Sequence, residues 1–440
     1  MDNIFPIKQG LPFQFTDKPV TPWGGLRLVQ EMLLRMKFRE ALASSGLPQP
    51  RSNRGYDPVV MMEAFLVCVW IGGVRFSHTS VVRFDKALCD IFGWRSVASV
   101  STFTRWFRRF KREEVDQVFN FLGSWFWNQL SPRTVTLDLD SSTITRYGEQ
   151  EGVIKGYNRH KNGKPSHRPF FAFIADWRMV LHTWLRSGNA PDTNGIREFM
   201  QEALSLLGQR HRVGLVRADA GFYDGEFLEM LETKSIGYIV SARLTAPLRQ
   251  EIADMKQWLS IEPGLEFAEF QYKGIYWQKA RRMVVVRHEL KRRPQALGKN
   301  LIEVPGYKFT AFVTTLELPP ADIWRLYNGR SDSENRIAEL KADFGLNGFC
   351  LDPFYATEAA LRSVMLAYNL MSLFRQALLQ APTAIKLSTM RFQCFALGSW
   401  IGREGRRKVL RISLDARRRP WFEGLFAKIG AFRCPWPAPA

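Results

Sequence analysis

The chain has 440 residues, and its 62 Lys and Arg against 42 Asp and Glu give a formal net charge of +20 at pH 7. The length predicts roughly two to four domains, and a hydrophobic share of 46% excludes a mostly disordered chain. Such an excess of positive charge indicates a polyanionic partner, most simply nucleic acid. An anionic membrane surface is the weaker alternative.

Nothing in the sequence predicts a secreted or membrane-spanning protein. The five cysteines are scattered and form no CxxC pair, which favours free thiols in a reducing cytosol over a zinc site or a disulfide framework. The longest apolar run, 64–74, is too short to cross a bilayer, which takes roughly 20 residues. Residues 1–10 do not resemble the start of a signal peptide. We therefore expect a cytoplasmic protein without a membrane partner.

Residues 1–130 are expected to form a helical DNA-binding domain. Apolar residues recur at helical spacing over 24–46, 57–72, 79–92 and 101–128. The segment 101–113, STFTRWFRRFKRE, predicts a basic helix that Ser101 or Thr102 caps. Together with the helix before it, this segment resembles a helix-turn-helix, and a solvated basic helix on a bundle is the alternative. The residues expected to contact DNA are Arg105, Arg108, Arg109 and Arg112.

From residue 131 the pattern changes to strands. TVTLDLD, residues 134–140, alternates strictly between polar and apolar side chains, which predicts a strand. Further strands are expected at 170–176, 179–185, 213–219 and 238–242, with helices at 193–207 and 224–234. Three strands followed by alternating helix and strand predict a mixed α/β sheet with helices on its faces, as in an RNase H-like core over 131–242.

The second half of the chain interrupts this core and then completes it. Residues 243–318 are expected to be a β-rich insertion, with strands at 267–272, 282–290 and 308–316. The core resumes over 319–380, with a long helix from Pro319 to about residue 344 and another over 355–380. Residues 381–440, with a helix at 384–399, are expected to be a basic region of helix and tail. The expected fold class is multidomain α+β.

Three acids are candidates for metal-dependent chemistry. Asp140 ends the first predicted core strand and Asp219 ends the fourth. These strands are neighbours in an RNase H-like sheet, so the two carboxylates can meet at one edge, and Glu334 can join them from a helix that crosses that edge. Three carboxylates can hold two Mg²⁺ ions, which activate the attacking oxygen and stabilise the leaving 3′ oxygen. The residues predict phosphodiester chemistry on DNA.

The run LDLD offers two aspartates for the first metal ligand. Asp138 and Asp140 share one face of the strand, so only one of them can stand where the other acids converge. Active-site carboxylates lie near the carboxyl end of a strand, which favours Asp140. Asp138 is then expected to accept hydrogen bonds behind the site, although a catalytic role for Asp138 stays open.

The helix that carries Glu334 has a polar face. At about 100° per residue, four polar residues share an arc of about 60°; they are Tyr327, Arg330, Glu334 and Lys341. Arg330 and Lys341 are expected to hold phosphates of the strand being cut, and Tyr327 to bond a phosphate or order its neighbours. Glu339 and Asp343 fall outside this arc and are expected to be solvated.

Other polar residues near the site have simpler expected roles. The segment 153–169 is rich in Lys, Arg and Gly and follows Asp140. It is expected to contact the DNA backbone, with a mobile solvated loop as the alternative. Its basic residues are Lys155, Arg159, Lys161, Lys164 and Arg168. Asp192 is expected to cap the following helix, and His182 to pack in the core.

The spacing Y-x2-R-x3-E-x6-K over residues 327–341 resembles the signature of a large group of bacterial DDE insertion-sequence transposases. Asp219 in VRADAGF and Asp140 in LDLDSSTITRYG resemble the two aspartate strands of that family. The β-rich insertion also lies where this group has one. The resemblance covers roughly 130–380, and the N-terminal and C-terminal regions match only in character.

The resemblance implies cut-and-paste transposition. It implies a homodimer on double-stranded DNA, namely the terminal inverted repeats and a target, and a nucleoid-associated place in the bacterial cytoplasm. It further implies nicking with two Mg²⁺ ions per site, with Mn²⁺ as a substitute, then a DNA hairpin and strand transfer. The family places a stacking aromatic near the Glu helix, where Phe309 stands in this chain, and a core Phe309 is the alternative.

Two other functions stay open. One is an RNase H-like nuclease without strand transfer, which would not need the basic helical domain and tail. The other is a non-catalytic DNA-binding protein descended from a transposase, against which the three acids argue.

Overall fold

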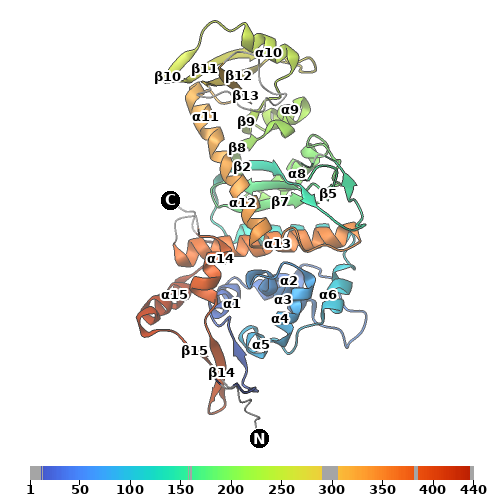
Figure 1. Ribbon diagram of the computed structural model, residues 1–440, viewed down its shortest axis with the longest axis vertical. Coiled ribbons are helices and arrows are strands. Elements are labelled where there is room, and N and C mark those ends of the chain that lie inside the picture. The colour runs from blue at the N-terminus through green and yellow to red at the C-terminus, as the bar shows by residue number, and fades with distance from the viewer. Residues whose placement is uncertain are drawn as a thin grey trace.

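The computed structural model describes residues 11, 13–156, 158, 161–289, 306–380 and 385–436. The described chain is elongated, with a group of helices at one end, one long helix across the middle and a large mixed sheet at the other end (Figure 1). This confirms the mixed α+β class that the sequence predicts. None of the helices in these residues is long and apolar enough to cross a membrane.

The N-terminal region is helical, as predicted. After a short strand β1 (Val20–Thr21), its helices are α1 (Leu26–Arg35), α2 (Phe38–Ser44), α3 (Pro58–Trp70), α4 (Thr79–Phe84), α5 (Lys86–Phe92), α6 (Val100–Phe107) and α7 (Arg112–Asn128). The basic segment 101–113 is not one helix, because α6 ends before α7 begins. Its cap is Ser99, whose side chain accepts from the Thr102 amide at 3.3 Å, rather than Ser101 or Thr102.

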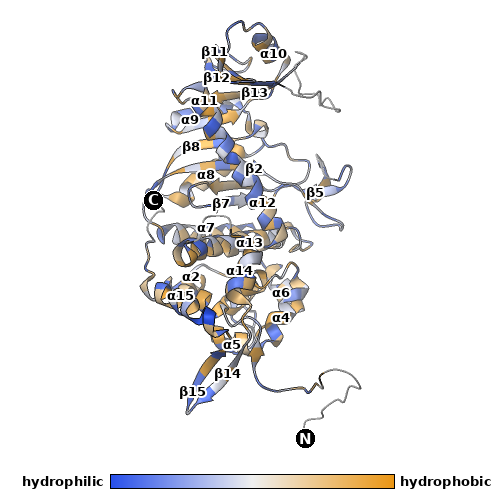
Figure 2. Cartoon of the chain, turned by 60° about the vertical axis from the view of Figure 1, so that its left-hand side comes forward, coloured by the Kyte–Doolittle hydropathy of each residue, from blue (hydrophilic) through white to orange (hydrophobic). Residues whose placement is uncertain are grey.

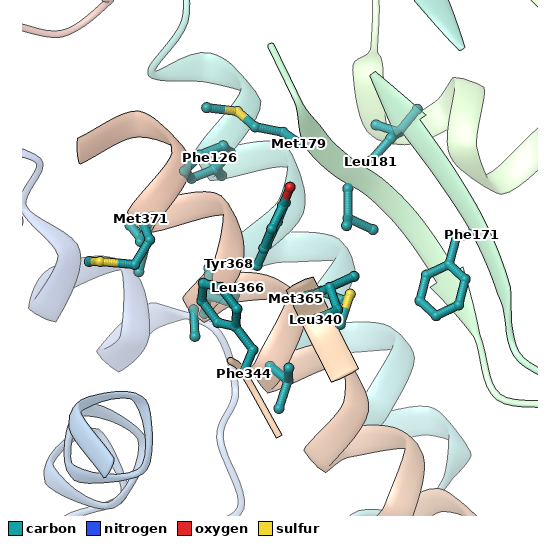
Figure 3. Packing of buried hydrophobic residues seen from close by; sticks show 14 of the residues in the cluster. Phe126, Phe171, Met179, Leu181, Leu340, Phe344, Met365, Leu366, Tyr368 and Met371 are labelled. Atoms are coloured by element: carbon teal, nitrogen blue, oxygen red, sulfur yellow. The ribbon is translucent and has the colours of Figure 1, made fainter. Parts of the chain in front are cut away.

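A buried helix joins this bundle to the sheet. Helix α13 (Phe354–Phe374) is buried from Ala356 to its end, and it packs against α3, α6 and α7 on one side and against strand β7 (Met179–Trp184) on the other. Figure 3 shows Met365 and Tyr368 of α13 among apolar side chains of the neighbouring elements. One continuous hydrophobic core therefore runs from the helical bundle into the sheet.

The half of the sheet that contains β2 has the predicted neighbours. Its strands are β2 (Thr134–Ser141), β6 (Phe170–Ile174), β7, β8 (Arg212–Ala218) and β9 (Gly237–Ser241), in the spatial order β7-β6-β2-β8-β9. Strands β2, β8 and β9 are parallel, whereas β6 and β7 are each antiparallel to the strand before. Helices α8 (Ile196–Leu207) and α9 (Gly225–Thr233) connect the later strands. The predicted adjacency of the first and fourth strands is confirmed.

The insertion is β-rich, as predicted, and it continues the same sheet. Its elements are α10 (Ala246–Ala253), β10 (Leu259–Glu262), β11 (Leu265–Tyr272), β12 (Arg281–Glu289) and β13 (Tyr307–Thr314). Strand β13 pairs antiparallel with β9, so core and insertion share one nine-stranded sheet. A second apolar cluster, which includes Phe267 and Ile323, covers one face of these strands beneath α11 (Pro320–Asn328).

The C-terminal third differs from the prediction at two places. The helix expected to reach residue 344 is broken into α11, a 3₁₀ turn η3 (Gly329–Ser331) and α12 (Asp332–Ala342), which cross the sheet toward α13 (Figure 1). After α14 (Leu387–Met390) the chain forms a hairpin of β14 (Ser399–Glu404) and β15 (Arg407–Ile412), then α15 (Arg419–Ala431). The predicted region of helix and tail was thus incomplete. Figure 2 shows hydrophilic residues along this hairpin, whose β14 pairs with β1.

We expect the protein to lose stability in acid because His182 is buried. His182 lies in the core as expected, 4% exposed, with Nε2 3.0 Å from a Glu202 carboxylate oxygen. Burial lowers the pKa of His182 to about 4, whereas an unfolded chain binds that proton near pH 6.5. Its contribution to stability is therefore complete above pH 6.5 and is lost as the pH falls toward 4, by up to about 3 kcal/mol.

We expect His182→Gln to flatten this part of the pH dependence, because glutamine keeps a donor for Glu202 and does not titrate. Urea unfolding of both proteins at pH 7 and pH 5 measures the effect. Equal losses of stability in the two proteins would contradict it.

Candidate active site

Two aspartates meet at the edge of the sheet. Asp140 lies near the end of β2, and Asp219 directly follows the parallel neighbour β8. The buried Asp140 carboxylate accepts from the Ser141 amide and from the Ser333 hydroxyl of α12, each at 2.8 Å. Asp219 is half-exposed, and its Oδ1 accepts from the Gly221 amide at 2.8 Å. The sequence-predicted pair is therefore brought together, with one carboxylate enclosed and one open to solvent.

Arg330 contacts both aspartates. Its Nη2 lies 3.2 Å from Asp140 Oδ1 and 3.7 Å from Asp219 Oδ2, and the guanidinium also donates to the carbonyl of Leu139 at 3.3 Å. Burial raises the pKa of Asp140, while Arg330 and then Ser333 oppose that rise. The positive charge of Arg330 thus favours the ionised form of a carboxylate, which burial disfavours.

The break between α11 and α12 places Arg330 at this edge. Arg217 of β8 donates from Nη1 to the carbonyl of Leu326 at 2.6 Å, close to the end of α11. A Cβ on Gly329 would lie 2.6 Å from the same Nη1, so a larger residue there would require the Arg217 side chain to shift. Asp138 in turn holds Arg217 through two contacts of 2.6 and 2.9 Å and is 0% exposed. Asp138 therefore lies behind the site and fixes the turn through Arg217.

Sequence reasoning placed Asp138 in this kind of role but missed Arg217. The available signal was an arginine inside the apolar strand VGLVRAD. A charged residue in such a strand needs a buried partner.

Glu334 stands apart from the two aspartates. It lies on the first turn of α12, next to the Ser333 that bonds Asp140, and its side chain is exposed. Across the described part of the chain, no group of three or more His, Cys, Asp or Glu side chains is arranged to hold a metal ion. The structure therefore brings together Asp140 and Asp219. Glu334 does not contact them in the described residues, although Ser333, the residue before it, donates to Asp140.

Tyr327 and Lys341 flank the aspartates. The Tyr327 ring packs against Phe312 of β13, with 4.5 Å between ring centroids, and burial raises its pKa, with Asp219 adding to the rise. Lys341 Nζ donates to the carbonyl of Thr143 at 3.3 Å. Burial lowers the pKa of Lys341, and the nearby Asp140 opposes that shift. Of the polar face predicted for the helix, Tyr327, Arg330 and Lys341 therefore gather around the aspartates, whereas Glu334 does not.

Asp192, Arg168 and Arg243 extend the site, and of these Asp192 and Arg243 were not predicted to belong to it. Asp192 does not cap α8, which starts at Ile196; instead its carboxylate accepts from Arg168 at 2.5 Å. Arg168 also donates to the hydroxyl of Ser141, next to Asp140. Arg243 donates to the carbonyls of residues 220 and 221, directly after Asp219. Arg168, Asp192 and Arg243 line a cavity of about 540 Å³. Arg243 had no local sequence signal.

Glu339 and Asp343 are buried, so the prediction that they are solvated was wrong. Glu339 pairs with Arg375 at 2.6 Å, and Asp343 accepts from the amide and hydroxyl of Ser388. Their side of α12 packs under the segments around α13 and α14, which a helical projection of one isolated helix does not include.

The predicted DNA-contacting residues of the helical region lie at or near the surface, with contacts inside the chain. Arg108 pairs with Asp352 at 2.8 Å, and Arg112 is 3.8 Å from Asp116. Arg105 and Arg109 each donate to a backbone carbonyl, at 3.2 and 2.8 Å. These contacts leave the expected DNA contact of this region a prediction.

The segment 153–169 is more ordered than a loop. With β3 (Ile144–Thr145), its strands β4 (Ile154–Lys155) and β5 (Pro165–His167) form a small antiparallel sheet. Lys155, Lys161 and Lys164 are exposed on it, and Arg159 lies outside the described residues.

Phe309 is buried rather than displayed to DNA. It is 6% exposed, with its ring centroid 5.9 Å from that of Trp258 and 6.4 Å from that of Tyr307. This placement favours the core alternative over base stacking.

Two aspartates at the ends of neighbouring parallel strands, with Tyr327, Arg330 and Lys341 around them, form a site of carboxylates and cations that suits phosphodiester chemistry. A family model described as transposase DDE domain group 1 matches residues 8–434. The chain belongs to this family and is a DDE transposase. Among solved structures it is similar to a piggyBac transposase synaptic complex with hairpin DNA, at 11% identity and a TM-score of 0.49, over 86% of this chain and 81% of that one. A search of curated proteins finds no match.

The donor chemistry of this edge suits a hard divalent cation. DDE transposases use divalent metal ions. Asp140 and Asp219 present carboxylate oxygens, the ligands that Mg²⁺ and Mn²⁺ prefer, and they already share one cationic partner in Arg330. The half-exposed Asp219 gives an ion access from solvent.

Proposed function

We propose that this protein is a cut-and-paste transposase that cleaves the ends of an insertion sequence and joins them to target DNA. Asp140, Asp219 and Glu334 would hold two Mg²⁺ ions, with Mn²⁺ as a substitute. The observation that carries the proposal is the contact of Arg330 with both Asp140 and Asp219 at neighbouring strand ends. It supports a site in which carboxylates and cations alternate, as phosphodiester chemistry requires.

Each residue has a role that follows from its environment. Bound metal ions would activate the attacking oxygen and stabilise the leaving oxygen. Arg330 opposes the rise that burial causes in the pKa of Asp140, and Ser333 donates a hydrogen bond to the same carboxylate. Glu334 faces solvent, where DNA approaches, and Lys341 places a charge near Asp140 for a phosphate of the cut strand.

The same proposal specifies the binding partners, namely DNA and a second copy of the chain. A homodimer would hold two terminal inverted repeats and the target DNA, in the nucleoid of a bacterial cytoplasm. The exposed Lys155, Lys161 and Lys164 and the arginines near α6 supply positive charge for the backbone. The expected reaction order is a nick, a hairpin and strand transfer.

The test uses purified protein, Mg²⁺ and DNA that ends in the inverted repeats flanking the gene. We expect nicked, hairpin and strand-transfer products from that DNA, and none from a scrambled repeat. Cleavage of both DNAs without hairpin or transfer would favour the nuclease alternative. Specific binding without cleavage would favour the non-catalytic one.

Arg330→Ala is expected to destabilise the protein by about 3 kcal/mol at pH 7, because it leaves the buried Asp140 carboxylate beside Asp219 without its cation. The loss should be smaller at pH 5, where Asp140 can take up a proton. Mg²⁺ should raise the melting temperature of the variant more than that of the wild type. The double variant Arg330→Ala/Asp140→Asn is the control, and it should be the more stable of the two. Equal destabilisation at both pH values and in both variants would show that Arg330 acts through packing alone.

A further inference from the structure

A second basic cavity lies beside Lys341, between the helical region and the sheet. Its volume is about 520 Å³, within the range of sites that take a small ligand or one nucleotide. Three segments line it: the stretch before α4, the chain from Thr143 through the small sheet, and the chain from Lys341 to Cys350. Residues far apart in the sequence therefore line one cavity that is open to solvent.

The lining of this cavity is strongly positive. Its charged residues are Arg75, Arg146, Lys161 and Lys341, and none of the described residues that line it is Asp or Glu. Arg146 is 4% exposed and donates to the Asn347 carbonyl at 2.6 Å and to His167 at 3.4 Å. Within the described residues, Arg146 forms no ion pair with a carboxylate. A buried guanidinium with only neutral partners is costly, and an anion in the cavity would offset that cost.

The cavity also offers an aromatic ring. Tyr147 is 75% exposed, and the ammonium of Lys161 lies 5.1 Å from its ring centroid and bonds its hydroxyl. Exposed aromatic rings next to cations are the means by which proteins hold single-stranded nucleic acid, since each base stacks on a ring while the cations meet the phosphates. A largely exposed ring on a folded surface otherwise contributes little to stability.

Lys341 connects this cavity to the catalytic edge. Its Nζ donates a hydrogen bond to the carbonyl of Thr143, three residues after Asp140. The ammonium also interacts electrostatically with the Asp140 carboxyl. We propose that the cavity binds one nucleotide of a single DNA strand beside the catalytic aspartates, with the phosphate at Arg146 and Lys341 and the base on Tyr147. The site is separate from Phe309 on the insertion. It rests on the proposed function for its place in the reaction.

The test measures binding of a fluorescent short oligothymidylate in a chelating buffer, where no cleavage occurs. Tyr147→Ala should weaken binding by roughly 5-fold to 100-fold, and Arg75→Ala should lower the salt slope by about 0.7. Matched controls are Phe84→Ala, which removes a ring that is 74% exposed outside the cavity, and Arg83→Ala. Both controls should bind as the wild type does. All four residues are exposed, so their loss leaves the core intact.

Two results would overturn the inference. One is wild-type binding by both Tyr147→Ala and Arg75→Ala. The other is equal competition by duplex DNA, which would make the cavity part of a general backbone surface. Its failure is distinct from failure of the proposed function. If cleavage depends on Asp140 while the cavity variants bind normally, only the cavity assignment falls. If the variants lose strand binding but the wild type never cleaves repeat-ended DNA, the cavity stands and the transposition proposal falls.

Discussion

Asp140→Asn is expected to lower metal-dependent cleavage of repeat-ended DNA by at least about 10³-fold, equivalent to roughly 4 kcal/mol of transition-state stabilisation. The variant loses the negative charge of the enclosed carboxylate, which would hold a metal ion together with Asp219. An asparagine oxygen can still accept from Ser141 and Ser333, so the fold and DNA binding should persist. Cleavage rates at matched DNA occupancy give the result.

Asp138→Asn is the matched control for that experiment. It breaks the buried pair with Arg217 and should cost about 3–5 kcal/mol of stability. Because Asp138 is enclosed behind the site, the folded fraction should keep measurable cleavage. If Asp138→Asn is inactive and Asp140→Asn cleaves normally in folded protein, the first metal ligand has been assigned to the wrong aspartate.

Glu334→Gln is expected to abolish cleavage with almost no change in stability. The Glu334 side chain is exposed and forms no ion pair within the described residues, so its replacement should change the free energy of unfolding by less than about 0.5 kcal/mol. Cleavage should nevertheless fall by about 10³-fold, because Glu334 would be the third carboxylate of the proposed metal site. End binding should persist, since no cation is lost.

Asp322→Asn is the control for Glu334→Gln. Asp322 is a half-exposed acid on α11, and it pairs with Arg325 three residues later. It should cleave as the wild type does. Normal cleavage by Glu334→Gln would remove Glu334 from the site.

Local patterns were enough to predict the sheet and its two aspartates. The alternation in TVTLDLD defines β2, and the order of strands and helices that follows makes β8 its neighbour. Those two facts place Asp140 and Asp219 at one edge. The spacing of Tyr327, Arg330 and Lys341 likewise survives in space, although the helix between them is broken.

The features that the sequence did not predict correctly depend on contacts between segments that are distant in sequence. The turn at Gly329 depends on Arg217, a residue of β8 that no local pattern connects to α11. Glu339 is buried beside two partners that are distant in sequence, Arg375 in the π-helical segment after α13 and the amide of Leu387. The position of Glu334 relative to the aspartates depends on the same broken helix.

The hairpin of β14 and β15 was missed for a different reason. Gly405, with a φ of +59°, stands at its turn and was a usable signal. Its strands are rich in charged residues, which resemble a solvated tail. Pairing of β14 with β1 at the other end of the chain stabilises them, and that pairing is not visible in the local sequence.

The central claim is that Asp219 holds the metal ion that cleavage needs, and a cysteine substitution tests it most directly. Mg²⁺ strongly prefers oxygen ligands, whereas the transition ion Mn²⁺ accepts sulfur more readily. Cleavage of repeat-ended DNA by Asp219→Cys is measured with each ion, with Asp219→Ala as control. We expect the cysteine variant to be inactive with Mg²⁺ and active with Mn²⁺, and the alanine variant to be inactive with both. Equal cleavage by the cysteine variant with both ions would contradict the account. Cleavage by the alanine variant at the wild-type rate, with either ion, would also contradict it.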